Sequence, residues 1–323
     1  MLDHILVPLD GSTLAECVLP HAIAIGKVFN AQITLVHVLG QPSASLRLPK
    51  ADPLDWSLKK SAANLYLNTV QARLEKDHLS VQTLLLEGGA AEKIIELAHS
   101  IQTDLLILSG YGETEVNGGG GVSSITQQIL QRVRISTLII RTRQPIRENT
   151  GALHYQKLLV PLDGSQRAGS ALTMAAAFAE AYQSKLLLVH VVSKPEMARY
   201  MPLSQADAEL VNRFIERNQE EGSKYLEQTQ AHLPSNTQTR LLVSDNVAAE
   251  LQNVSEQEQI DLLVLSAHGY SGEARWPYGS ITNRFITNGT IPLLIVQDLQ
   301  WESSEVARTG TETRQLVRQT DVI

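Results

Sequence analysis

Short apolar runs alternate along the chain with longer stretches in which apolar and polar residues follow a helical period. Continuous Leu, Val and Ile runs are typical of strands buried on both faces of a parallel sheet, and the amphipathic stretches are typical of its covering helices. In the first half, this pattern predicts strands at 3–9, 31–39, 81–87, 104–109 and 135–141. It predicts helices at 13–29, 54–78, 89–101 and 123–132.

The second half shows the same alternation. Its apolar runs predict strands at 156–162, 184–192, 237–243, 260–266 and 291–297. Its amphipathic stretches predict helices at 166–182, 203–231, 246–258 and 279–288. Strands that alternate with helices form parallel sheets, so we expect each half to be a five-stranded, doubly wound α/β sandwich.

The two halves are copies of each other. The phrase ILVPLDGS at 5–12 returns as LLVPLDGS at 158–165, which is 153 positions later. A tandem duplication predicts a domain at 1–143, a second at 155–298, and a polar C-terminal tail at 299–323. Because the predicted linker is short, we expect the copies to pack as a pseudo-twofold pair, like a homodimer within one chain.

Length and charge limit the functional classes. The 323 residues suit two units of about 150 residues each. The first 150 residues carry 13 basic and 14 acidic side chains, and the remaining residues carry 14 basic and 20 acidic ones. Because nucleic-acid binding needs a cationic surface and neither half is basic, we do not expect a nucleic-acid partner. No apolar run approaches the roughly 20 residues of a membrane helix, the chain starts directly with a strand, and there is one cysteine. We therefore expect a cytoplasmic protein without a membrane partner.

Candidate chemistry lies at the carboxyl ends of the predicted strands, where parallel sheets form their crevice. Asp163 follows the first strand of the second copy, and Asp10 is its counterpart. Such a carboxylate can accept hydrogen bonds from ribose hydroxyls or an adenine amine. The alternative is that Asp-Gly-Ser forms only a turn and a helix N-cap.

A second signal follows the fourth strand of the second copy, where SAHG at 266–269 is separated by nine residues from GSIT at 279–282. Glycines allow a backbone to approach a ligand, and free amides at a helix start favour phosphate. The alternative is a flexible connection. His37 and His190 recur on the second strand without a cluster of further ligands, so we predict structural histidines and no metal site.

VPLDGS at the first strand, LVHV at the second and the Gly-x9-Gly-Ser loop together resemble the universal stress protein family. The resemblance covers about residues 1–142 and 156–297. It implies a five-stranded parallel α/β fold, dimerisation, and a role in survival under stress. It also implies, for one subclass, binding of ATP or AMP through Gly-x2-Gly-x9-Gly followed by Ser or Thr.

The resemblance assigns nucleotide contacts in the second copy. Asp163 would contact the adenosine, and the backbone of Val191 would bind adenine. Ser266 replaces the first glycine of the motif and adds a side chain beside the expected ligand. The full predicted site is Pro161, Leu162, Asp163, Val191, Leu265, Ser266, His268, Gly269, Gly279, Ser280 and Ile281.

The first copy departs further from this pattern, because serines stand at two glycine positions. We expect a weaker or empty site there, and the second domain to be the main site. The residues of this possible second site are Pro8, Leu9, Asp10, Val38, Ser109, Gly112, Ser123 and Ser124.

Absent motifs narrow the chemistry. The chain has no Gly-x4-Gly-Lys-Ser/Thr loop, no Gly-x-Gly-x2-Gly after a strand and no Gly-x-Ser-x-Gly elbow. The first hypothesis is therefore a stress-associated module that binds ATP or AMP and reports it to an unknown protein partner. The alternatives are a slow ATP hydrolase, in which Asp163 positions Mg²⁺ or water, and a nucleotide-free scaffold. Two chains could further associate into a four-domain assembly.

Overall fold

A computed structural model describes residues 2–40, 53–111, 121–141, 153–195, 204–269 and 277–298. In the first domain it contains all the strands and helices expected from the sequence, with ends shifted by a few residues. They are β1 (His4–Pro8), a 3-10 turn (Ala15–Val18), α1 (Leu19–Phe29), β2 (Gln32–Leu39), α2 (Pro53–Glu75), β3 (Val81–Glu87), α3 (Ala90–Ser100), β4 (Leu105–Ser109), α4 (Ser124–Arg132) and β5 (Ser136–Ile140).

The second domain repeats this order. Its elements are β6 (Lys157–Pro161), α5 (Ala168–Tyr182), β7 (Lys185–Ser193), α6 (Gln205–Gln230), β8 (Thr237–Ser244), α7 (Val247–Gln257), β9 (Leu262–Ser266), α8 (Ser280–Asn288) and β10 (Leu293–Val296).

The first helix differs from its prediction at 13–29. The segment starts as a 3-10 turn, and the α-helix begins at Leu19. Pro20 lies in the first turn of α1, where its missing N–H removes a hydrogen bond to the preceding turn. Thr173 stands at the equivalent position of the second domain, and α5 is regular from Ala168 onward.

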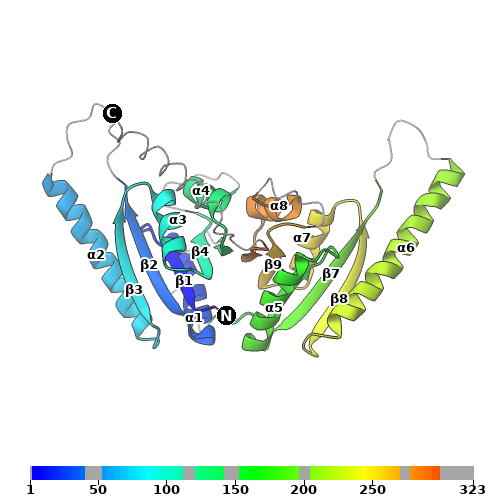
Figure 1. Cartoon of the computed structure of the whole chain (residues 1–323), viewed down its shortest axis with the longest axis horizontal. Coiled ribbons are helices and arrows are strands. Elements are labelled where there is room, and N and C mark those ends of the chain that lie inside the picture. Colours follow the sequence, from blue (N-terminus) through cyan, green and yellow to red (C-terminus); the bar gives the residue numbers. More distant parts are fainter. Residues whose placement is uncertain are drawn as a thin grey trace, which may run out of the picture.

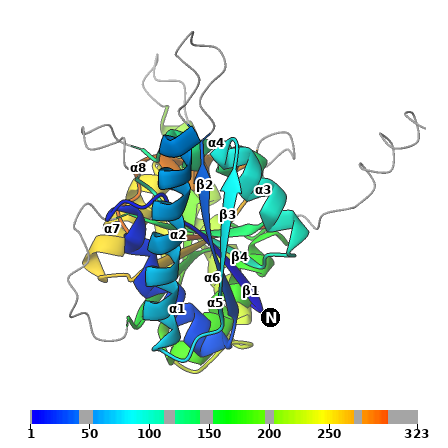
Figure 2. The same ribbon diagram turned by 90° about the vertical axis from the view of Figure 1, so that its left-hand side faces the viewer.

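All ten strands form one sheet with the order β3-β2-β1-β4-β5-β10-β9-β6-β7-β8. The domains lie on either side of its centre, with α2 and α6 at the outer ends (Figure 1). Figure 2 shows α1 and α2 on one side of β2 and β3, and α3 on the other. The sheet is therefore covered by helices on both faces, with an apolar core on each face.

The domains join through β5 and β10, the antiparallel pair in this otherwise parallel sheet. Leu138 pairs with Leu294, its own counterpart in the second copy. Ile139 pairs with Leu293 and Thr137 with Ile295, so the register is self-complementary about a pseudo-twofold axis. The predicted α/β tandem fold and intramolecular pseudo-dimer are confirmed. The two-chain, four-domain assembly stays a prediction.

An aromatic cluster reinforces this junction between α1 and α5. Tyr155 is 1% exposed, and its hydroxyl shares a 2.7 Å hydrogen bond with Nδ1 of His21. Its ring lies 6.0 Å from Phe178 and 5.3 Å from Tyr182, and Phe29 lies 5.2 Å from Phe178. Tyr155, beside the linker, thus packs against both domains.

Among the described helices, none combines the length and apolarity that a membrane span requires.

Candidate functional site

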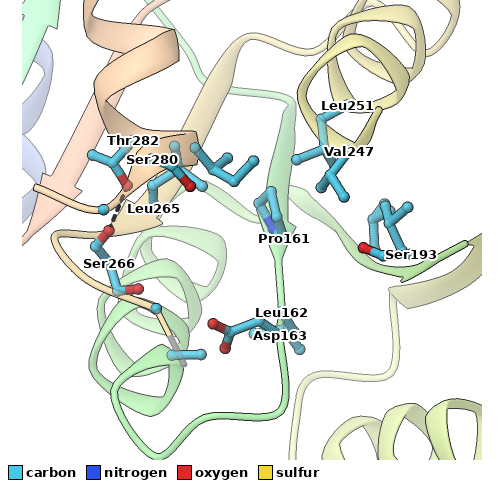
Figure 3. A pocket seen from close by; sticks show the side chains of 16 residues that line it. Pro161, Leu162, Asp163, Ser193, Val247, Leu251, Leu265, Ser266, Ser280 and Thr282 are labelled. Atoms are coloured by element: carbon cyan, nitrogen blue, oxygen red, sulfur yellow. Dashed lines mark hydrogen bonds between the residues drawn. The ribbon is translucent and has the colours of Figure 1, made fainter. Parts of the chain in front are cut away.

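A cavity of about 360 Å³ opens at the carboxyl ends of β6, β7 and β9 in the second domain (Figure 3). Ten of the residues predicted from the sequence line it. They are Pro161, Leu162, Asp163, Val191, Leu265, Ser266, Gly269, Gly279, Ser280 and Ile281. The cavity thus brings together the ends of β6, β7 and β9 and the start of α8. The role of these residues toward a ligand stays a prediction.

Asp163 serves the turn after β6 and also lines the cavity. Its Oδ1 accepts a 2.9 Å hydrogen bond from the backbone N–H of Ser165. Gly164 has φ +80°, the left-handed conformation that favours glycine. Ser165 Oγ in turn accepts from the N–H of Ala168 at the start of α5. The turn anticipated as the alternative to a site therefore exists, and it holds the carboxylate at the cavity wall.

Gly269 is required by its distance to that carboxylate. A Cβ at this position would lie 2.5 Å from Oδ2 of Asp163. Any side chain at 269 would displace either the loop or the carboxylate. The glycine of the second motif and the aspartate of the first thus form one structural unit.

Val191 offers backbone hydrogen-bonding groups to the cavity. The carbonyl of Val189 accepts from the N–H of Leu162, so residue 189 faces β6. Alternate residues of a parallel strand face the same neighbour, so Val191 also faces the β6 side. Pro161, the last residue of β6, pairs with Val189. The N–H and C=O of Val191 therefore extend beyond the end of β6, into the crevice.

Ser266 replaces the first motif glycine without closing the cavity. Its hydroxyl donates a 2.7 Å hydrogen bond to the carbonyl of His268. Thr282 Oγ1 donates to the carbonyl of Ser266 at 2.8 Å, as Figure 3 shows. The added side chain therefore braces the loop on which it lies.

Gly279 is the N-cap of α8 and begins the predicted phosphate cradle. Its N–H donates to the carbonyl of Ala267 at 2.8 Å, which ties it to the loop after β9. It has no side chain with which to accept a hydrogen bond from the first turn of α8. Its φ is −65°, so the glycine is not required by backbone strain. Because the start of α8 has no side-chain cap and lines the cavity, its free amides and its helix dipole face the cavity.

His268 was predicted to border the nucleotide, and the structure places it outside the cavity lining. Its side chain is 1% exposed, and its Nδ1 lies 2.9 Å from Oδ1 of Asp298, whose side chain is 0% exposed. The Nε of Arg167 lies 3.5 Å from Oδ2 of the same carboxylate. The buried pairing draws the ring inward, so His268 anchors the loop to the end of β10.

The first domain has a smaller cavity of about 220 Å³ at the equivalent place. Predicted residues that line it are Pro8, Leu9, Asp10, Val38, Ser109, Ser123 and Ser124. Gly112 lies outside the described residues. Ser123 is the N-cap of α4, and its Oγ accepts a 3.1 Å hydrogen bond from the N–H of Thr126. The Ser123 side chain thus binds an amide of the first turn of α4. In the second domain, Gly279 has no side chain that could bind the equivalent amide of α8.

Sequence reasoning missed six lining residues of the larger cavity. They are Ala168, Val189, Ser193, Val247, Leu251 and Thr282. Internal repetition could have found Val247, Leu251 and Thr282, because Ala90, Ile94 and Thr126 line the first cavity at equivalent positions. Ser193 follows from strand geometry, since it shares the crevice-facing side of β7 with Val191.

The recurrent histidines support the backbone. Nδ1 of His190 lies 2.7 Å from the carbonyl of Leu162, and Nδ1 of His37 lies 2.8 Å from that of Leu9. Both therefore hold the loop after the first strand of their domain. The described residues contain no group of three or more His, Cys, Asp or Glu placed to hold a metal ion.

Comparison with known proteins gives consistent matches across the chain. The model of the universal stress protein family matches residues 1–141 and 154–297. A universal stress protein of Mycobacterium tuberculosis is 23% identical over 305 residues, which are 91% of this chain and 96% of that protein. One from Methanocaldococcus jannaschii is 25% identical over 142 residues, 44% of this chain and 83% of its own length. The crystal structure of a universal stress protein from Archaeoglobus fulgidus DSM 4304 has a TM-score of 0.64 and 14% identity, and the match covers 93% of this chain and 100% of that one.

Proposed function

The chain belongs to the universal stress protein family, and we propose that its second domain binds ATP or AMP in a sensing or regulatory role. One observation carries the proposal. An apolar slot, the carboxylate of Asp163 and the N-terminus of α8, which lacks a side-chain cap, surround the same cavity of about 360 Å³. A nucleotide combines an apolar base, a ribose with two hydroxyls and an anionic chain, and each component matches one of these walls.

In the proposed complex, the adenine lies against Pro161 and Leu162 and bonds the backbone of Val191. The ribose hydroxyls donate to Asp163. The phosphates accept from the backbone amides of Ser280 and Ile281 at the start of α8, and from the Ser280 hydroxyl. A Mg²⁺ ion, where present, accompanies the phosphates. Among the described residues, the lining offers groups suited to hold a nucleotide and no lysine to assist phosphoryl transfer.

The test is isothermal titration of the full chain with ATP and with AMP, together with native mass spectrometry for co-purified nucleotide. We expect binding to the wild type and a loss of at least about a hundredfold in Gly279→Asp, because a carboxylate beside the phosphates repels them. Ser204→Asp places the same charge at the N-cap of α6, which does not line either cavity, and is the matched control. It should bind as the wild type does.

The proposal fails if the wild type binds neither nucleotide at millimolar concentration and carries none after purification. Thermal unfolding gives a second measurement, because a ligand that binds the folded chain raises its melting temperature. Release of phosphate that is fast in the wild type and absent in Gly279→Asp would instead support the hydrolase.

A further inference from the structure

Arg141 of the first domain binds the helix that begins at the second domain's cavity. It follows β5, and its Nη1 donates hydrogen bonds to the carbonyls of Phe285 at 2.8 Å and Gly289 at 2.5 Å. Its Nη2 donates to the carbonyl of Ile286. All three carbonyls lie at the C-terminal end of α8. A cation at this end is favoured by the helix dipole. The carbonyl of Phe285 also accepts from the N–H of Gly289, so Arg141 adds to the capping of the last turn of α8.

Two glycines make room for this side chain. A Cβ at Gly289 would lie 2.9 Å from Nη1 of Arg141, and a Cβ at Gly110 would lie 2.7 Å from its Cγ. Gly110 belongs to the loop of the first cavity, between the lining residues Ser109 and Tyr111. The stem of Arg141 therefore packs on one nucleotide-type loop while its guanidinium holds the helix of the other.

Gly110 is also tied to the helix start in its own domain. Its carbonyl accepts a 2.8 Å hydrogen bond from the N–H of Ser123, the N-cap of α4, and its N–H donates to the carbonyl of Ile140 at 2.7 Å. A shift of the loop that carries Gly110 would thus move the surface on which Arg141 packs. Arg141 in turn binds the C-terminal end of α8, and Gly279 and Ser280 lie at the other end of this helix.

Within the part of the chain that the structure describes, the arrangement has no counterpart in the opposite direction. Gln297 occupies the position equivalent to Arg141 after β10, and its Oε1 has no hydrogen-bond partner within the described residues. Val133 stands where α8 has Gly289, and Ala267 stands where the first domain has Gly110. The contacts that admit an arginine therefore occur on one side of the pseudo-twofold axis.

We propose that Arg141 is an interdomain positioning residue that makes the second domain's affinity for nucleotide depend on the state of the first domain's loop. This inference rests on the proposed function, because it concerns the same site. Occupation or displacement of the loop at Gly110 moves Arg141, and Arg141 moves α8. The first cavity then acts on the second even if its own affinity for nucleotide is low.

The test is a double-variant cycle with ATP affinity as the readout. Arg141→Gln installs the residue that the second domain has, and Gly110→Ala crowds the stem of the arginine from the first domain. Each should weaken ATP binding about fivefold, the lower end of typical couplings between sites. If Arg141 carries the coupling, the double variant should bind no more weakly than Arg141→Gln alone.

Arg141→Lys keeps the charge and one or two of the hydrogen bonds, so it should recover part of the loss. Arg132→Gln is the matched control, because Arg132 pairs with Glu92 on the surface of the first domain. It should bind as the wild type does. Circular dichroism of each variant confirms that the fold is retained.

Wild-type affinity in both Arg141→Gln and Gly110→Ala overturns the inference and leaves the proposed nucleotide site intact. Independent effects that multiply to about 25-fold in the double variant also overturn it. Absence of ATP binding by the wild type removes the proposed function, and the inference with it.

Discussion

Ser123 in the first domain and Gly279 in the second occupy the same position before equivalent helices, and the two helix starts differ. Ser123 Oγ accepts a hydrogen bond from the N–H of Thr126, whereas Gly279 has no side chain to do so. A capping side chain and an anionic ligand compete for the same amides. A helix start therefore becomes available to a ligand when its own cap is absent.

The loops beside these helix starts also differ. In the second domain, His268 pairs with the buried carboxylate of Asp298, and Arg167 approaches that carboxylate from the start of α5. Tyr111 and Leu14 stand at the positions equivalent to His268 and Arg167 in the first domain. The second domain therefore holds its glycine-containing loop by a buried hydrogen bond from the loop to Asp298, which the first domain's residues cannot form.

The largest expected effect concerns His21 at the domain junction, whose counterpart in the other copy is Met174. Burial lowers the pKa of His21 from 6.5 to about 4. Between these values the unfolded chain binds the proton more readily, so the free energy of unfolding falls as the pH drops from 6.5 towards 4. We expect His21 to account for about 2 kcal/mol of the loss between pH 7.5 and 4.5.

Urea titrations of the wild type and of His21→Met at both pH values measure this loss. The variant removes the hydrogen bond to Tyr155, so it should be less stable at neutral pH and less sensitive to acid. His232→Gln, on the surface, should keep the full sensitivity of the wild type. Equal acid sensitivity in His21→Met and the wild type would contradict the assignment.

The next effect comes from making the second helix start resemble the first. Gly279→Ser adds a hydroxyl that can accept from the first turn of α8, and the nearest atoms to its Cβ lie at an ordinary 3.5 Å. The helix should gain stability, while ATP should bind about tenfold more weakly, because one charge-assisted hydrogen bond is lost. Calorimetric titration measures the affinity. Unchanged affinity would show that the phosphates do not use these amides.

The reciprocal change has the smallest expected effect. Ser123→Gly removes the cap of α4 and should cost only a few tenths of a kcal/mol in stability. In a Gly279→Asp background, any ATP binding that appears belongs to the first domain. We expect weak binding to become detectable by titration there. If none appears, the smaller cavity of about 220 Å³ limits the first domain more than its cap does.

The tandem fold and its strands were predictable from the sequence. Strands that are buried on both faces of a sheet appear in the sequence as continuous apolar runs, and these runs recur in both halves. The Leu, Val and Ile runs mark the strands within a few residues. The position of each motif at a strand end was enough to bring Asp163, Val191 and Gly279 to one cavity. Such predictions depend on period and topology, which are local properties of the chain.

Contacts between distant side chains were not predictable in this way. Nothing in the run around His268 indicates Asp298 as its partner, 30 residues away. Arg141 reaches helix carbonyls 144 to 148 residues away, and only the pairing of β5 with β10 brings them together. The position of Pro20 was visible in the sequence, yet its tightening of the first helical turn was not expected.

The antiparallel pairing of β5 with β10 has a genetic consequence. In an assembly of two identical chains, every substitution occurs twice, so a capped and an uncapped helix start cannot coexist. Here the partners are encoded separately and remain tethered at any dilution. A substitution in one half is therefore inherited without the same substitution in the other half. Selection can then favour a different role for each copy, such as binding a ligand in one and modulating that binding in the other.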